Sequence, residues 1–241
     1  MRRRLRPWVK IVMGVSSLCT TALLGTKLPV SDALPDSDHS ASESYVLEAE
    51  EEPKTLAEWK EINPKVKYVL SFQDEGVQRV IPVICTPDAA YALKHDIYGD
   101  YDTMGSVFCD PCNGDPVNLV IYGHASKTKD WGFTFLKHYL NRPYYERFPS
   151  FQLESASGMI PCRILSAGVY DMENEETVLS WADPDPGSPE EVTAMIRETM
   201  PYLKQRTDGL LYEGSGLVTL VTCDMTAPDA RIVIQAMRDA S

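Results

Sequence analysis

The chain has 241 residues, of which 44% are hydrophobic and 24% are charged, as expected for one substantial globular domain with a short accessory segment. Asp and Glu number 35 against 23 Lys and Arg, and six of the basic residues precede position 28. The remainder is strongly acidic. We therefore expect no nucleic-acid partner, because phosphate contacts need clustered Lys and Arg.

Residues 1–27 are expected to form a membrane anchor or a signal segment. The positive stretch MRRRLRPWVK precedes Ile11–Thr26, which carries no charge and is close to the length that spans a bilayer. A cleaved signal peptide, with small residues at Ser31 and Ala33, is the alternative. The positively charged flank is expected to stay on the cytoplasmic side of the membrane, whether the segment is an anchor or a cleaved signal peptide. We therefore expect a single-pass protein of the cell membrane with its acidic domain extracellular.

Residues 28–54 contain eight acidic residues together with Ser and Pro, and they have little apolar periodicity. This composition is typical of a flexible, solvated tether. The folded domain is expected to begin near Thr55, where TLAEWKEIN reads as a capped helical turn, and to cover residues 55–241.

Short β-strands dominate the expected domain. Apolar and β-branched runs between turn residues predict strands at 66–72, 77–85, 118–123, 151–155, 160–170, 217–223 and 231–239, and a segment at 87–96 that opens with Pro is expected to be helical. Few helices and about eight short strands favour a mainly β fold, a closed or nearly closed barrel with helical decorations.

One long helix is expected over residues 188–206. Ser188 is a good N-cap, Pro189 suits the first helical position, and Glu191 completes a capping box. Met195 and Leu203 belong to its apolar face. Pro201 is expected to kink this helix, because proline lacks the backbone donor.

A candidate nucleophile lies where TLVTCDMTAPDARIVI, residues 219–234, changes from strand to turn. Cys223 ends an apolar strand, and Arg231 begins the next strand after a short loop. A cysteine at a strand end can present its sulfur to a substrate. A guanidinium beside it would favour the thiolate and could hold an oxyanion. The alternative is a buried core cysteine with a surface arginine.

A thiol enzyme also needs a base or cationic partner, and histidine is the usual one. His124 follows an apolar strand and Gly123, again at a strand end. His39 lies in the tether, whereas His95 and His138 lie in segments expected to be helical, where surface or packing roles account for them. His124 is therefore the candidate general acid and base.

Several of these segments resemble class B sortases: TLVTC with Arg231 downstream, YGH followed by an F-x-x-L helix, GSVFCD at 105–110, the helical start around Trp59, and the helix at 188–206. The resemblance covers roughly residues 55–238. It implies a sortase-like closed β-barrel with an N-terminal helix and a long helix before the last strand pair.

Residue by residue, the resemblance implies Cys223 as nucleophile, His124 as general acid and base, and Arg231 as the cation that binds substrate and oxyanion. Leu220 and Thr222 would shape the substrate groove. Ala125 departs from the pattern, since many class B members have Asn there, which concerns the rim of the site. Asp224 is interpreted as the start of a turn, with orientation of His124 as the alternative.

The implied activity is that of a cysteine transpeptidase. It would cleave a C-terminal sorting motif of exported proteins and join the acyl group to an amine of a peptidoglycan precursor or a pilin, without a metal or organic cofactor. Two alternatives remain open. One is a catalytically silent surface binding module on the same barrel, and the other is an exported cysteine peptidase that transfers the acyl group to water.

The remaining cysteines pose a separate question. Outside the apolar segment the chain has Cys85, Cys109, Cys112, Cys162 and Cys223, an odd number that leaves at least one thiol without an intramolecular disulfide. Cys109-Asp-Pro-Cys112 is interpreted as structural thiols or a disulfide. A redox pair, or a zinc site completed by His124 and Cys162, is the alternative.

Overall fold

The computed structural model describes residues 54–111, 116–172, 181–182, 191–192, 194–195, 203–207, 216–227 and 229–238. Within these residues, nine strands form one sheet: β1 Val66–Asp74, β2 Val77–Cys85, β3 Val107–Cys109, β4 Asn118–Tyr122, β5 Ser150–Ser155, β6 Gly158–Asp171, β7 Leu203–Arg206, β8 Gly216–Cys223 and β9 Ala230–Arg238.

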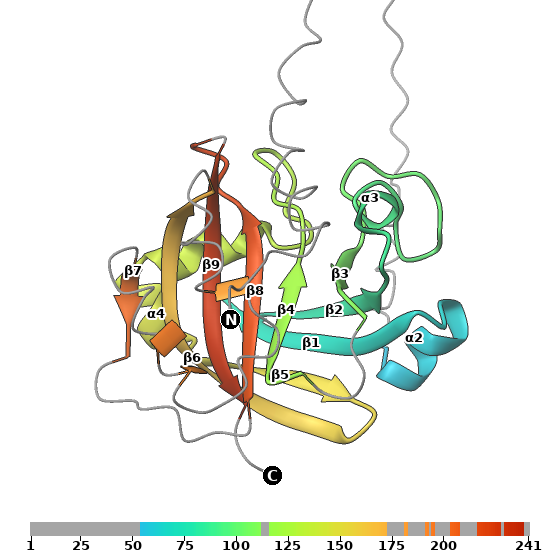
Figure 1. The fold of residues 1–241 in the computed structure, drawn as a ribbon, viewed down its shortest axis with the longest axis horizontal. Coiled ribbons are helices and arrows are strands. Elements are labelled where there is room, and N and C mark those ends of the chain that lie inside the picture. Colours follow the sequence, from blue (N-terminus) through green and yellow to red (C-terminus); the bar gives the residue numbers. More distant parts are fainter. Residues whose placement is uncertain are drawn as a thin grey trace, which may run out of the picture.

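The sheet closes on itself (Figure 1). Its strand order is β5-β1-β2-β3-β4-β8-β9-β6-β7, and an additional pairing between β5 and β6 joins the two sides. Eight strands therefore form a closed ring, while β7 extends the sheet from β6. The prediction of a mainly β, closed barrel of about eight strands is confirmed.

The helices that the structure describes along their whole length are short. They are α2 Leu56–Ile62, α3 Ala89–Ala92, the 3-10 helix η2 Thr134–Leu140 and α4 Arg142–Arg147. The predicted N-terminal helix is confirmed, because Thr55 and Glu58 form a capping box that satisfies backbone donors at the start of α2. The segment expected to be helical at 87–96 forms a single turn, α3.

The long helix expected over residues 188–206 is corrected at its end. Leu203–Arg206 is strand β7, which pairs antiparallel with β6. Pro201 explains the change, since proline removes a helix donor and disfavours helical geometry in the residue before it. Four described positions, at 191–192 and 194–195, are helical. The other positions from 188 to 202 lie outside the described residues.

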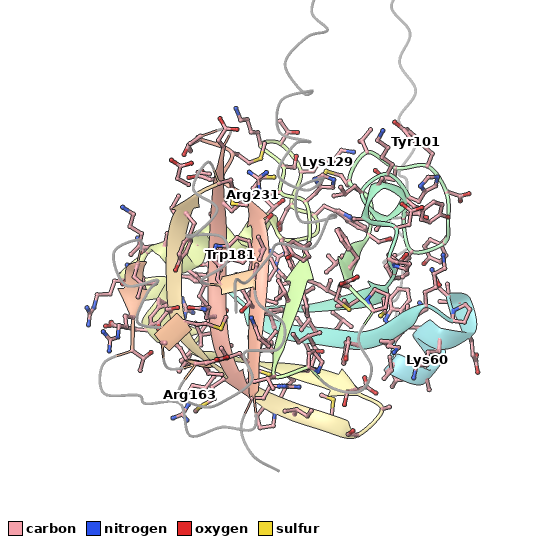
Figure 2. All side chains as sticks on the ribbon, in the orientation of Figure 1. Lys60, Tyr101, Lys129, Arg163, Trp181 and Arg231 are labelled. Carbon is pink, nitrogen blue, oxygen red and sulfur yellow. The ribbon has the colours of Figure 1, made fainter. Side chains whose placement is uncertain are left out.

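Two apolar layers lie on opposite faces of the central strands. Along β4 and β8, Leu119, Ile121, Val218 and Leu220 pack into the cluster that fills the barrel. Their alternate neighbours pack into a second cluster on the outer face, which contains Val120, Tyr122, Val221, Val233 and Trp181. Figure 2 shows Trp181 over β8 and β9. Burial on both faces explains why these strands read as continuous apolar runs.

Candidate active site

The candidate site lies where two neighbouring strands, β4 and β8, end and a third, β9, begins. Cys223 at the end of β8 is the registered partner of Arg231 on β9. On the other side of β8, β4 runs parallel, with Tyr122 opposite Val221. Figure 1 shows β8 between β4 and β9.

Two hydrogen bonds continue the alignment beyond the end of β4. The Gly123 amide donates to the carbonyl oxygen of Val221 at 3.1 Å. The Thr222 hydroxyl donates to the carbonyl oxygen of Gly123 at 2.8 Å. His124 is therefore held beside the end of β8, next to Cys223. The structure thus brings together the three residues that were expected to carry the chemistry, although they come from two distant parts of the sequence.

The alternation of side chains along a strand determines which face each residue uses. Cys223 lies two residues after Val221, and Arg231 two residues before Val233, so both belong to the outer face of the barrel. Leu220 and Thr222 belong to the inner face.

The placement of Leu220 and Thr222 corrects the expectation that they shape a groove beside the thiol. Leu220 is 0% exposed in the barrel core. Thr222 is 2% exposed, and its hydroxyl is bound to the Gly123 carbonyl. Both residues support the strand that carries Cys223 instead of lining its outer face.

Arg231 is deeply buried for an arginine, with 2% of the residue exposed. One of its terminal nitrogens, Nη1, donates to the carbonyl oxygen of Ala230 at 3.0 Å. Figure 2 shows Arg231 toward the end of β8 and the start of β9, with Lys129 in the neighbouring loop after β4. Cys223 itself is half-buried and has a free thiol. The site thus pairs a partly accessible thiol with a cation held against the sheet.

His124 has a defined tautomer. Its Nε2 lies 3.1 Å from the carbonyl oxygen of Leu93, and because a carbonyl only accepts, Nε2 carries the hydrogen. In the neutral ring, Nδ1 is then the nitrogen that can accept a proton. Burial lowers the pKa of His124 below 6.5; the bond to Leu93 opposes this shift, and the charge of Arg231 adds to it. The neutral ring therefore predominates at neutral pH.

The interpretation of Asp224 as a turn residue is confirmed. Its Oδ1 accepts from the Thr226 amide at 2.9 Å and from the Thr226 hydroxyl at 2.7 Å. Its amide donates to the carbonyl oxygen of Ala230 at 3.0 Å, which closes the loop between β8 and β9. The carboxylate that follows the thiol thus shapes the turn.

Among the other cysteines that the structure describes, Cys85 ends β2 and Cys109 ends β3, and neither of these strand ends carries the candidate site. Cys109 and Cys162 are buried in the barrel core, and Cys85 packs against it. Cys112 lies outside the described residues. Within the described part of the chain, no group of three or more His, Cys, Asp or Glu side chains could hold a metal ion. Nor does any helix of this part have the length and apolarity to cross a membrane.

The loop that begins at His124 is fastened at its base. The Phe133 amide donates to the carbonyl oxygen of His124 at 2.9 Å. Farther along, Asp130 accepts from Nη2 of Arg79 at 2.7 Å, and Arg79 also forms an ion pair with Asp74. Tyr144 donates its hydroxyl to the same Asp74 at 2.7 Å. Arg79 therefore links a buried carboxylate of the barrel to the loop of the candidate site.

We expect Arg79→Ala to lower the free energy of unfolding by about 2–3 kcal/mol, because it deprives the buried Asp74 carboxylate of its cation. Asp130→Ala should cost less than about 1 kcal/mol, since the Asp130 side chain is 63% exposed. Urea unfolding of both variants measures the difference. Equal losses of unfolding free energy would mean that Arg79 stabilises the protein through its ion pair with Asp130 and not through its pair with Asp74.

Comparison with known proteins supports the fold. No family model matches the sequence, and no curated protein matches it. Among solved structures, a sortase B of Clostridium perfringens aligns with a TM-score of 0.66 at 24% identity, over 77% of this chain and 100% of that chain. A Staphylococcus aureus sortase B–substrate complex aligns with a TM-score of 0.64 at 19% identity, over 77% and 85%.

A third structure belongs to the same class. A Streptococcus pyogenes class B sortase involved in pilus biogenesis aligns with a TM-score of 0.62 at 18% identity, over 76% of this chain and 97% of that chain. The chain therefore has the class B sortase fold, as its motifs indicated.

Proposed function

We propose that the protein is a sortase-type cysteine transpeptidase. Its substrates would be exported proteins with a C-terminal sorting motif. The second substrate would be an amine of a peptidoglycan precursor or a pilin. The observation that carries this proposal is the meeting of His124, Cys223 and Arg231 at the ends of three adjacent strands.

In the proposed reaction, Sγ of Cys223 gives its proton to Nδ1 of His124 and attacks a backbone carbonyl carbon of the sorting motif. The guanidinium of Arg231 stabilises the oxyanion that forms. His124 gives a proton to the departing amine, and the C–N bond breaks to leave a thioacyl enzyme. The acceptor amine then attacks the thioester and loses a proton to His124, the C–S bond breaks, and His124 returns the proton to the Cys223 sulfur. Two acyl transfers replace one difficult amide exchange.

The proposal needs no metal and no organic cofactor. Residues 1–27 would anchor the protein in the cytoplasmic membrane with a single pass, and the acidic tether 28–54 would separate this anchor from an extracellular catalytic domain at 55–241. The proposal is supported by the fold shared with a sortase B solved with its substrate and with a class B sortase involved in pilus biogenesis.

Incubation of the full chain in detergent with a library of sorting-motif peptides and candidate amines tests this function. Mass spectrometry of the products distinguishes its alternatives. We expect a product in which the acyl part of one peptide is joined to an amine. Release of the free acid alone, with every amine, would identify a peptidase that uses water. Peptide binding with no change in mass would identify a silent binding module.

A further inference from the structure

The contact that fixes the tautomer and the position of the His124 ring comes from outside the strands that carry the site. We propose that the backbone carbonyl of Leu93, kept in place by Gly105, orients His124 and directs Nδ1 toward the proton transfers. This inference rests on the proposed transpeptidase function. It makes Leu93 and Gly105 positioning residues, since neither is required to touch the reacting atoms.

The hydrogen bond from His124 is the first observation. Nε2–H donates to the Leu93 oxygen at 3.1 Å. A histidine that moves protons must keep one tautomer, and a hydrogen bond to the other ring nitrogen fixes it. In many sites a carboxylate plays this part. Here the neighbouring carboxylate, Asp224, is bound to Thr226. The backbone carbonyl is therefore the acceptor that holds the ring.

The end of α3 supplies this carbonyl. Leu93 is the C-cap residue, and its own amide donates to the carbonyl oxygen of Ala89 at 3.0 Å. Carbonyls at a helix end have no donor within the helix, so they remain available to a side chain. The Asp88 side chain caps the other end of α3 by accepting from the Tyr91 amide at 2.9 Å. The turn that presents the Leu93 oxygen is thus fixed at both ends.

Gly105 allows the chain to pass directly against this turn. Its φ is +56°, and a Cβ there would lie 2.4 Å from the Ala92 oxygen, 2.6 Å from the Leu93 carbonyl carbon and 2.8 Å from the Leu93 oxygen. Each distance is too short for a real contact, and the atoms met are backbone. The next residue, Ser106, donates its amide to the Ala92 oxygen at 2.8 Å. Any side chain at position 105 must therefore displace the carbonyl that holds His124.

The electrostatic surroundings of the ring agree with this role. Arg231 is the charged side chain in the described part of the chain that shifts the pKa of His124, and it lowers that pKa in addition to burial. The bond to Leu93 acts in the opposite direction. Loss of this bond would therefore release the ring from its tautomer and make protonation harder. Both effects would reduce the fraction of His124 that is ready for proton transfer.

Gly105→Ala in the full chain tests the proposal against a matched control, Gly158→Ala. Gly158 also has a positive φ, +110°, but a Cβ there meets nothing within 4 Å. We expect Gly105→Ala to lower kcat by about 10–100-fold with little change in KM, as a misplaced catalytic group does. Gly158→Ala should keep kcat within about threefold, because its effect is confined to a distant hairpin.

Nitrogen-15 spectra of the histidine rings give a readout that a merely structural role would not move. We expect wild-type His124 to be protonated at Nε2, the Gly158 variant to match it, and Gly105→Ala to show mixed tautomers. Wild-type His124 protonated at Nδ1, or a Gly105 variant with unchanged tautomer and kcat, would overturn the proposal. If Gly105→Ala does not fold, the wild-type spectrum alone decides the question.

The spectrum does not depend on turnover, so the two proposals can fail separately. A wild-type ring protonated at Nε2 in a protein that joins no peptide to any amine would refute the function and leave the orientation of His124 standing. Transpeptidation by a protein whose His124 is protonated at Nδ1 would refute the role of Leu93 and leave the function standing.

Discussion

We expect Cys223→Ala to abolish the proposed transpeptidation, with a loss on the order of 10⁶-fold in rate. Alanine removes the only atom of this residue that can form the thioacyl bond, and no other group of the site offers a comparable nucleophile at that position. The fold should survive the change, because Cys223 is half-buried at a strand end and its backbone pairing with Arg231 does not need the sulfur.

Product formation from one peptide and one amine measures this loss, and Cys85→Ala provides the control. Cys85 has the same half-buried character but lies on β2, away from the candidate site, so its variant should keep activity. A peptide vinyl sulfone should label Cys223 ahead of the other cysteines. Preferential labelling of Cys109 or Cys112 would transfer the chemistry to that pair and contradict the assignment.

Arg231→Lys is expected to be nearly as damaging as Arg231→Ala, with a loss of at least about 10²–10³-fold in kcat. A lysine would preserve the positive charge, so it should suffice if charge alone activated the thiol. The proposed role needs a planar group with several donors, held in one orientation beside the substrate carbonyl. The bond from Nη1 to Ala230 fixes that orientation, and a flexible ammonium cannot reproduce it.

Arg238→Lys is the matched control for this series. Arg238 lies on the same strand, is 5% exposed, and donates to the carbonyl oxygen of Pro116, but it pairs with Gly216 at the opposite end of β8. Its variant should change stability and keep the chemistry. Rates of thiol alkylation, recorded alongside, separate activation of the thiol from stabilisation of the oxyanion. An Arg231→Lys enzyme with more than about a tenth of wild-type activity would refute the oxyanion role.

Most of the strands could be predicted because their residues are apolar or β-branched and turn residues separate them. The turn between β1 and β2 is an example, since Glu75 and Gly76 adopt the positive φ values that a tight hairpin requires. Strand β3 was missed, because its three residues Val107–Cys109 are too few to show a period. Pro201 predicted only a kink in the expected helix, because the pairing of β7 with β6 is a long-range property that the local sequence does not reveal.

The candidate site was predictable where chemistry depends on residue type. Cysteine, histidine and arginine at strand ends gave a consistent hypothesis, and the structure brings all three together. Leu220 and Thr222 lie three residues and one residue before Cys223 on the same strand, so alternation predicts that their side chains point to the opposite face. Their position in the TLVTC motif had instead suggested that they shape the groove. The contact from Leu93 had no sequence signal, because the acceptor is a backbone atom that every residue possesses.

The order of the strands along the chain also affects biosynthesis. β8 and β9 follow all other described strands in the sequence, yet the ring places them between β4 and β6. A nascent chain emerging from the ribosome would carry His124 long before it carried Cys223 or Arg231. Insertion of the last hairpin would then close the barrel and assemble the site in one event. Partly synthesised chains would therefore lack a complete candidate site, which would arise only in molecules whose translation had passed β9.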